Sequence, residues 1–163
     1  MTPEIHDFVR GLKLRGKTLE VGSLDVNGSV RELFRDYIGV DMRPGKNVDK
    51  VANCHTLPFK SSSFQNVLSL DMLEHDEEFW LSVAEMRRVL RKGGRMVITV
   101  PGLGFPKHDH PFDFYRFTVE AVELMFKGFR KVEVRAVGDY AWSPIGLITV
   151  NGFAAVHAHG VKS

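Results

Sequence analysis

The chain has 163 residues, a length that suits one globular domain with a sizeable core. Charged residues make up 26% of it and the formal net charge is only +2, so no global field favours nucleic acid or a membrane surface as partner. Cys54 is the only cysteine, which excludes an internal disulfide framework. Neither a membrane-spanning run nor a signal-peptide core is present, so we expect a cytoplasmic protein.

The first elements predicted are a short helix and a strand that leads into a glycine turn. Apolar residues near Pro3 share one helical face, and they are Ile5, Phe8, Val9 and Leu12. Residues 18–28 then have the pattern of a buried strand followed by a turn. Gly22 and Gly28 allow this turn to be tight and let a ligand lie against bare backbone.

A helix and a second strand are expected directly after this turn. The helix is predicted by apolar residues at helical spacing, which are Val30, Leu33, Phe34 and Tyr37. The strand covers residues 37–40 and ends at Asp41. A carboxylate at that point, about 20 residues after the first strand, can accept hydrogen bonds from both hydroxyls of a ribose.

The middle of the chain continues to alternate between strands and helices. Residues 48–51 suit a short third strand, and the apolar run at 67–70 suits a buried fourth one. Residues 77–90 have one apolar face and predict a helix, which residues 92–94 (Lys-Gly-Gly) would end. A fifth strand is expected over residues 95–100.

The last third opens with a loop over residues 103–117 that is rich in aromatic residues, histidines and prolines. Loops of this length in a compact domain are usually functional or disordered, and the aromatic content argues against disorder. Thr118 is expected to cap a helix that ends at Phe126. Residues 129–137 alternate as a strand, whereas residues 145–161 suit either a strand or a helix.

This alternation predicts an α/β fold: a single domain over residues 1–163 with a doubly wound, mostly parallel sheet. In such sheets a ligand binds beyond the carboxyl ends of the strands, near the point where the strand order reverses. The residues expected along that rim are Gly22, Asp41, Asn53, Cys54, Asp71 and Met72.

Five sequence blocks, in order, resemble a small Rossmann-like class I S-adenosylmethionine-dependent methyltransferase of the methyltransferase-domain-11 type. The blocks are LEVGSLDVNGS, YIGVD, NCHTLPFKSSSFQNVLSLDMLEH, EMRRVLRKGGRMVITVPG and HDHPFDFYRFT, and they cover most of residues 18–120. The resemblance implies S-adenosyl-L-methionine as the cofactor. It also implies a methyl acceptor that is a small molecule or a glycan precursor.

The resemblance further implies nine cofactor-binding residues. Those at the methionine part are Glu20, Gly22, Ser23, Leu70 and Asp71. Those at the ribose and the adenine are Asp41, Met42, Asn53 and the backbone of Cys54. Two positions depart from the family pattern, because Leu24 stands where a small residue is usual and Asn53 where aspartate is frequent.

Methyl transfer is an in-line displacement that needs a general base only if the acceptor starts protonated. The catalytic candidates in the aromatic loop are His108, His110 and Tyr115, with Asp109, His75 and Tyr140 as further ones. His108 and His110 also have the spacing of metal ligands, but no third ligand is evident, so no metal is predicted. Asp113 and Arg116 are expected to pair and hold the loop, while its aromatic residues either line an acceptor pocket or pack on the sheet.

Three functions remain open from the sequence. The first is an active methyltransferase. The second is a cofactor-binding subunit or regulator without catalysis, which the altered glycine motif favours. The third is a nicotinamide-dependent oxidoreductase, against which the absence of G-x-G-x-x-G argues. No nucleic acid or membrane partner is expected, and the oligomeric state stays open.

Overall fold

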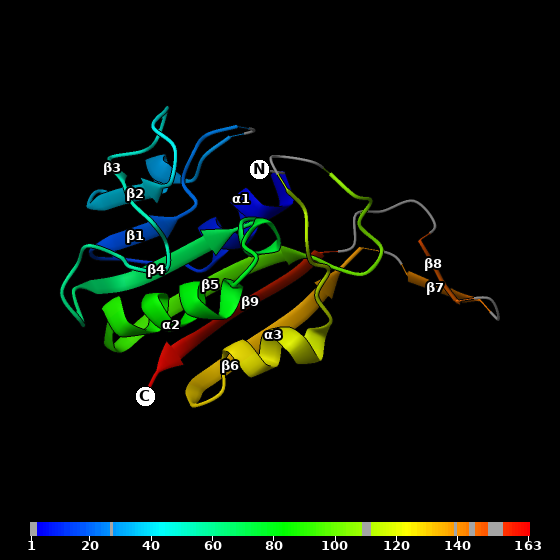
Figure 1. Cartoon of the computed structure of the whole chain (residues 1–163). Coiled ribbons are helices and arrows are strands. Elements are labelled where there is room, and N and C mark those ends of the chain that lie inside the picture. Colours follow the sequence, from blue (N-terminus) through cyan, green and yellow to red (C-terminus); the bar gives the residue numbers. More distant parts are fainter. Residues whose placement is uncertain (1–2, 27, 109–111, 139, 144–145, 150–154) are drawn as a thin grey trace.

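The computed structural model describes residues 3–26, 28–108, 112–138, 140–143, 146–149 and 155–163. A seven-stranded sheet forms its centre, in the order β3-β2-β1-β4-β5-β9-β6 (Figure 1). Its strands are β1 (Thr18–Val21), β2 (Tyr37–Asp41), β3 (Lys50–Val51), β4 (Phe64–Leu70), β5 (Leu90–Pro101), β6 (Phe129–Val137) and β9 (Ala155–Lys162). The strands β7 (Tyr140–Ser143) and β8 (Gly146–Thr149) pair only with each other among the described strands.

The sheet is parallel from β3 through β5, and β9 runs antiparallel between β5 and β6. This confirms the predicted doubly wound, mostly parallel α/β fold. The open question of the tail is answered as well, because β8 and β9 are both strands. Strand order reverses at β1, which lies between β2 and β4, so the expected binding crevice is at the carboxyl ends of β1 and β4.

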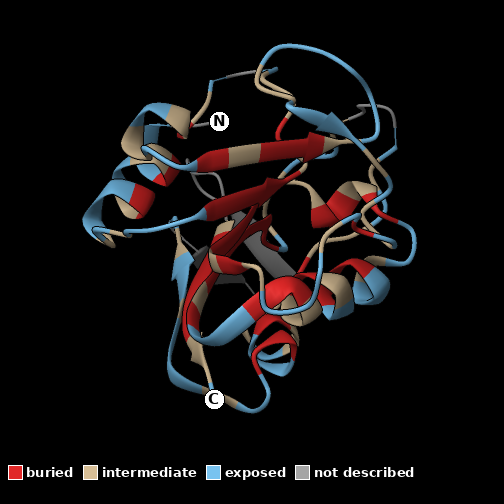
Figure 2. Ribbon diagram, turned by 90° about the vertical axis from the view of Figure 1, so that its left-hand side faces the viewer, coloured by how far each residue is buried: buried red, intermediate tan, exposed pale blue. Residues whose placement is uncertain are grey.

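Helices cover both faces of the sheet. The helices α2 (Phe79–Val89) and α3 (Val119–Met125) lie on one face, and α1 (Pro3–Gly11) lies on the other (Figure 1). Two core clusters match these faces: Val67 of β4 packs with α2 and α3, while its neighbour Leu68 packs with α1. Side chains alternate across a strand, so both faces of β4 are buried, as Figure 2 shows for the central strands.

The prediction of a helix after the first glycine turn is wrong, because the chain forms only a 3-10 turn there, η1 (Arg31–Leu33). Phe34 already has extended backbone, with φ −125° and ψ 139°. Upstream, the Asp25 carboxylate accepts from the Gly28 N–H and pairs with Lys46, which ties the loop to the connection between β2 and β3. The apolar spacing reflects packing instead, because Val30 and Leu33 contact the cluster under α1.

The predicted end of the helix over residues 77–90 is also wrong, because residues 92–94 do not cap this helix, which is α2 in the structure. The helix ends at Val89, and Leu90 is extended and starts β5 beside Phe64. Leu90 is fully buried, so its burial against β4 outweighs continuation of the helix. By contrast, the cap of α3 is confirmed, since the Thr118 side chain accepts from the Ala121 N–H. In the described part of the chain, no helix is long and apolar enough to cross a membrane.

Candidate functional site

The glycine turn after β1 meets the end of β4 at the carboxyl edge of the sheet. The N–H groups of Gly22 and Ser23 donate to the Val40 carbonyl oxygen at 2.8 and 3.0 Å, which closes the turn. Gly22 has φ +80°, and a Cβ there would lie 2.3 Å from Met72 Cγ. Both facts require glycine at this position. The structure thus brings Gly22 and Met72 together, as the predicted rim requires.

Asp41 ends β2 at the same edge with its carboxylate held by backbone. Its Oδ1 accepts from the Arg43 N–H at 2.9 Å and its Oδ2 from the Leu24 N–H at 3.3 Å. An ionised carboxylate has about four acceptor sites, so both oxygens can still accept from a ligand. Met42 follows with an exposed fraction of 66%, which leaves an apolar surface beside the carboxylate.

Asn53 lies exposed on the loop after β3 (Lys50–Val51). Its Oδ1 accepts from the His55 N–H at 2.8 Å. The Asn53 side chain therefore offers a ligand chiefly the two N–H bonds of Nδ2. An aspartate at this position would offer acceptors only, whereas the asparagine adds N–H donors.

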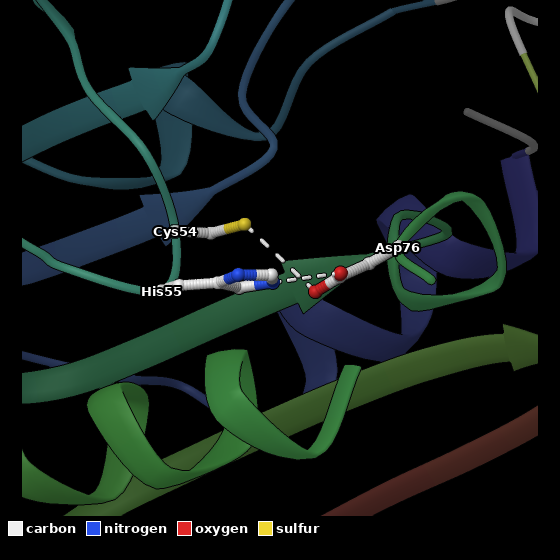
Figure 3. A group of neighbouring side chains, drawn as sticks. All are labelled: Cys54, His55 and Asp76. Atoms are coloured by element: carbon white, nitrogen blue, oxygen red, sulfur yellow. Dashed lines mark hydrogen bonds and ion pairs between the residues drawn. The ribbon is translucent and has the colours of Figure 1, made fainter. Parts of the chain in front are cut away.

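Cys54, His55 and Asp76 form a compact group behind this loop (Figure 3). His55 Nε2 lies 2.8 Å from Asp76 Oδ1, and Cys54 Sγ lies 3.8 Å from Asp76 Oδ2. The Ser82 hydroxyl also donates to Oδ2, at 2.5 Å, and the Glu78 N–H to Oδ1, at 3.1 Å. Burial raises the pKa of the Cys54 thiol, which keeps it protonated. The group is a hydrogen-bonded brace, and Cys54 is poorly suited to act as a nucleophile.

The side chains of Glu20 and Ser23 are engaged inside the protein. Glu20 is 3% exposed, and its Oε2 accepts from the Tyr37 hydroxyl at 2.6 Å. Burial raises the pKa of Glu20 to about 7. The Ser23 hydroxyl donates to the Asn47 carbonyl oxygen at 3.2 Å. Both side chains therefore stabilise the glycine turn and β2 from within.

A cavity of about 260 Å³ lies beside the carboxyl end of β4. Its polar lining includes Asp71, Glu74, His108 and His157. Asp71 directly follows the buried Leu70, has φ 49°, and accepts from the Thr99 hydroxyl at 2.8 Å. Burial, and then the charge of Glu74, raises the pKa of Asp71 to about 6. This end of the crevice therefore concentrates acidic groups.

Of the three catalytic candidates, His108 lines this cavity. The pKa of His108 is raised, first by its interaction with Glu74. His110 and the further candidate Asp109 lie outside the described residues. Tyr115 is committed elsewhere, because its hydroxyl donates to the Glu77 carbonyl oxygen at 2.7 Å.

The aromatic loop has a packed part and an exposed part. The expected pair is confirmed, since Arg116 binds both carboxylate oxygens of Asp113 at 2.6 Å. Phe117 is 3% exposed and packs edge-on against Phe79 of α2, so this part of the loop is core. Phe112, however, is 62% exposed and stacks on the exposed Phe114.

Sequence reasoning missed Glu74 as a site residue. Glu74 is fully buried in the turn η2 (Leu73–His75), and neither of its carboxylate oxygens has a hydrogen-bond partner among the described residues. The available signal was a glutamate–histidine pair just after a buried strand. The pair is visible in the sequence, but the burial of Glu74 and its lack of hydrogen bonds can be seen only in the tertiary structure.

Comparison with known proteins identifies the family. Residues 15–98 match the family described as "Methyltransferase domain". The ubiquinone/menaquinone biosynthesis C-methyltransferase UbiE of Hahella chejuensis is 33% identical over 119 residues, which are 69% of this chain and 45% of that protein. The UbiE of Geotalea daltonii is 26% identical over 102 residues, or 61% of this chain and 43% of that protein. The chain thus spans less than half the length of these relatives.

Solved structures share the fold at low sequence identity. A methyltransferase from Thermotoga maritima has a TM-score of 0.72 at 21% identity, over 97% of this chain and 87% of that one. The phosphoethanolamine N-methyltransferase 2 of Haemonchus contortus has a TM-score of 0.70 at 16% identity, over 98% of this chain and 52% of that one. The chain therefore belongs to the methyltransferase domain family and has the fold of a class I S-adenosylmethionine-dependent methyltransferase.

Proposed function

We propose that the chain binds S-adenosylmethionine along the carboxyl edge of β1, β2 and β4 and transfers its methyl group to a small-molecule or glycan-precursor acceptor. The observation that carries this proposal is the Asp41 carboxylate, which two backbone N–H groups hold at the tip of β2. Its remaining acceptor sites suit the two hydroxyls of a ribose. The Haemonchus contortus structure holds S-adenosylhomocysteine, and this supports the same cofactor here.

The other residues of the edge fit the rest of this cofactor. The exposed Met42 offers an apolar contact for the adenine ring, and Asn53 offers N–H donors to its ring nitrogens. We assign the methionine part to the glycine turn at Gly22, which is half-buried at this edge. At the end of β4, the Asp71 carboxylate favours a positive charge nearby.

When bound, the cofactor supplies an electrophilic methyl group on a positively charged sulfur. The protein contributes alignment, because holding the acceptor in line with that methyl group removes much of the entropic barrier. The cavity beside Asp71 and His108 is the space that we assign to the acceptor. Its volume of about 260 Å³ suits a small molecule or one end of a larger one.

One observation favours a second function, a cofactor-binding protein without catalysis. The helix expected after the glycine turn is replaced by the short turn η1, so the wall beside the methionine part is reduced. Production of S-adenosylhomocysteine with a panel of acceptors separates the two functions. The nicotinamide-dependent alternative is disfavoured by the family match.

Calorimetric titration with S-adenosylhomocysteine tests the cofactor site. We expect Asp41→Ala to weaken binding by about 1 to 3 kcal/mol, the cost of losing charge-assisted hydrogen bonds. Asp36→Ala is the matched control, because the exposed Asp36 lies just before the opposite end of the same strand. Unchanged affinity in Asp41→Ala would remove Asp41 from the site, and no binding by the unmodified protein would overturn the proposal.

A further inference from the structure

Glu74 is a buried carboxylate without a hydrogen bond. Its side chain is 0% exposed, and both oxygens lack a hydrogen-bond partner in the described part of the chain. The polar atoms that face it are His75 Nε2 and His108 Nε2, at 3.7 and 3.6 Å from Oε1. Both distances are too long for a hydrogen bond. Buried carboxylates are normally hydrogen-bonded or bound to a metal, and Glu74 has only these two ion pairs at distances beyond hydrogen bonding.

Each of the two histidines has an oxygen atom near its Nδ1. His75 Nδ1 hydrogen-bonds to the Phe112 carbonyl oxygen, and a carbonyl can only accept, so Nδ1 carries the proton. In the neutral ring, Nε2 then presents a lone pair toward Glu74. His108 Nδ1 lies 3.4 Å from Asp113 Oδ2, and Asp113 is itself clamped by Arg116. Metal-binding histidines typically have such a carbonyl or carboxylate behind the ring.

The spacing of these atoms fits one shared ion. The ligand atoms of Glu74, His75 and His108 all lie within 4.8 Å of one another. Two donors that each lie about 2.1 Å from one ion are roughly 3.0 to 3.4 Å apart. The observed 3.6 and 3.7 Å are close to this value, and the two histidine nitrogens, which lie within 4.8 Å of each other, would close around the ion. Glu74 and His108 also line the cavity next to Asp71, which gives an ion a path of entry.

We propose that Glu74, His75 and His108 bind a divalent first-row transition-metal ion. Two imidazole nitrogens with one carboxylate suit Zn²⁺, Mn²⁺ or Fe²⁺, whereas Ca²⁺ and Mg²⁺ prefer ligands that are all oxygen. Three protein ligands leave coordination positions that face the cavity. If the proposed methyl transfer is correct, on which this last step rests, the acceptor is of a class with a metal-binding oxygen, such as a hydroxyl.

Calorimetric titration of chelator-treated, tag-free protein with Zn²⁺ and Mn²⁺ tests the site, with Mg²⁺ and Ca²⁺ as comparison ions. We expect about one Zn²⁺ or Mn²⁺ per chain and much weaker binding of Mg²⁺ and Ca²⁺. Glu74→Gln should weaken Zn²⁺ binding by at least about 100-fold, because it removes a charged ligand. His108→Gln should do the same, and it is a safe second variant since this side chain is 37% exposed.

His55→Gln is the matched control, because His55 belongs to the other histidine–carboxylate group and should bind Zn²⁺ like the unmodified protein. Absence of Zn²⁺ and Mn²⁺ binding would overturn the proposal and would show that protonated histidines alone balance Glu74. Equal loss in His55→Gln and Glu74→Gln would overturn it as well. Binding of S-adenosylhomocysteine is a separate readout, so a failed metal site and a failed cofactor site are distinguishable.

Discussion

Two groups in this chain combine a carboxylate with histidine, and they differ in how the carboxylate is satisfied. Around Asp76, four donors converge. Figure 3 shows the side chains of His55 and Cys54, and the Ser82 hydroxyl and the Glu78 backbone N–H are the other two. Around Glu74, two histidine nitrogens face the carboxylate at distances beyond hydrogen bonding. Residue types alone would rank the two groups alike.

The difference identifies which group is structural. Asp76 follows η2 and is 9% exposed at the start of α2, where a hydroxyl and an N–H of neighbouring residues reach it. Glu74 points to the cavity side, where the described residues supply no donor in range. A buried carboxylate whose oxygens are all hydrogen-bonded holds a fold together, whereas one without hydrogen bonds calls for another explanation, such as a bound ion or a catalytic role.

Glu20 extends the comparison to a buried carboxylate with one described side-chain donor, Tyr37. Its pKa rises from 4.5 to about 7 in the folded state, so the folded protein keeps this proton longer than the unfolded chain does. Its stabilising effect is complete below about pH 4.5 and is lost as the pH rises through about 7. The full loss is about 3 kcal/mol.

Urea unfolding at several pH values checks this effect. Relative to Glu20→Gln, which cannot ionise, the unmodified protein should lose most of these 3 kcal/mol between about pH 5 and about pH 9. Other titrating groups are the same in both proteins and largely cancel. A parallel pH dependence of the two proteins would show that the Glu20 pKa is not raised.

Asp76→Asn and Glu74→Gln contrast the two groups directly. With a chelator present, Asp76→Asn should lower the free energy of unfolding by about 2 kcal/mol, because it weakens several hydrogen bonds to a charged group. Glu74→Gln should change it by no more than about 1 kcal/mol, because this carboxylate loses only its two ion pairs with His75 and His108, at distances beyond hydrogen bonding. Denaturant titration measures both. Destabilisation of similar size in the two variants would mean that Glu74 is as well satisfied as Asp76.

Arg116→Lys is expected to have a smaller effect than Asp76→Asn, and it acts on the support behind His108. Arg116 binds both oxygens of Asp113, which in turn lies behind His108, and lysine cannot reproduce this two-point contact. We expect Zn²⁺ affinity to fall by about tenfold, or about 1.4 kcal/mol. Arg88→Lys is the control, since Arg88 clamps Glu85 in the same way elsewhere. Equal changes in both variants would point to a general loss of stability.

Sequence reasoning predicted the fold better than the ends of its elements. The parallel strands were predictable because both faces of β4 are buried and its apolar run is nearly continuous. The absence of a helix after the glycine turn was not predictable. Val30 and Leu33 have helical spacing, but they pack under α1 as part of the short 3-10 turn η1. The spacing of apolar residues shows which side chains are buried, and more than one backbone conformation can bury the same side chains.

The sequence by itself determined the family, the order of the parallel strands, and the expected ribose-binding acid Asp41, since these depend on local patterns and motif order. Only the tertiary structure decided which polar residues meet. Glu74 and His108 are far apart in the sequence, and the tertiary structure brings them to one cavity beside the end of β4. Whether a buried carboxylate finds donors depends on such long-range contacts, which no local pattern encodes.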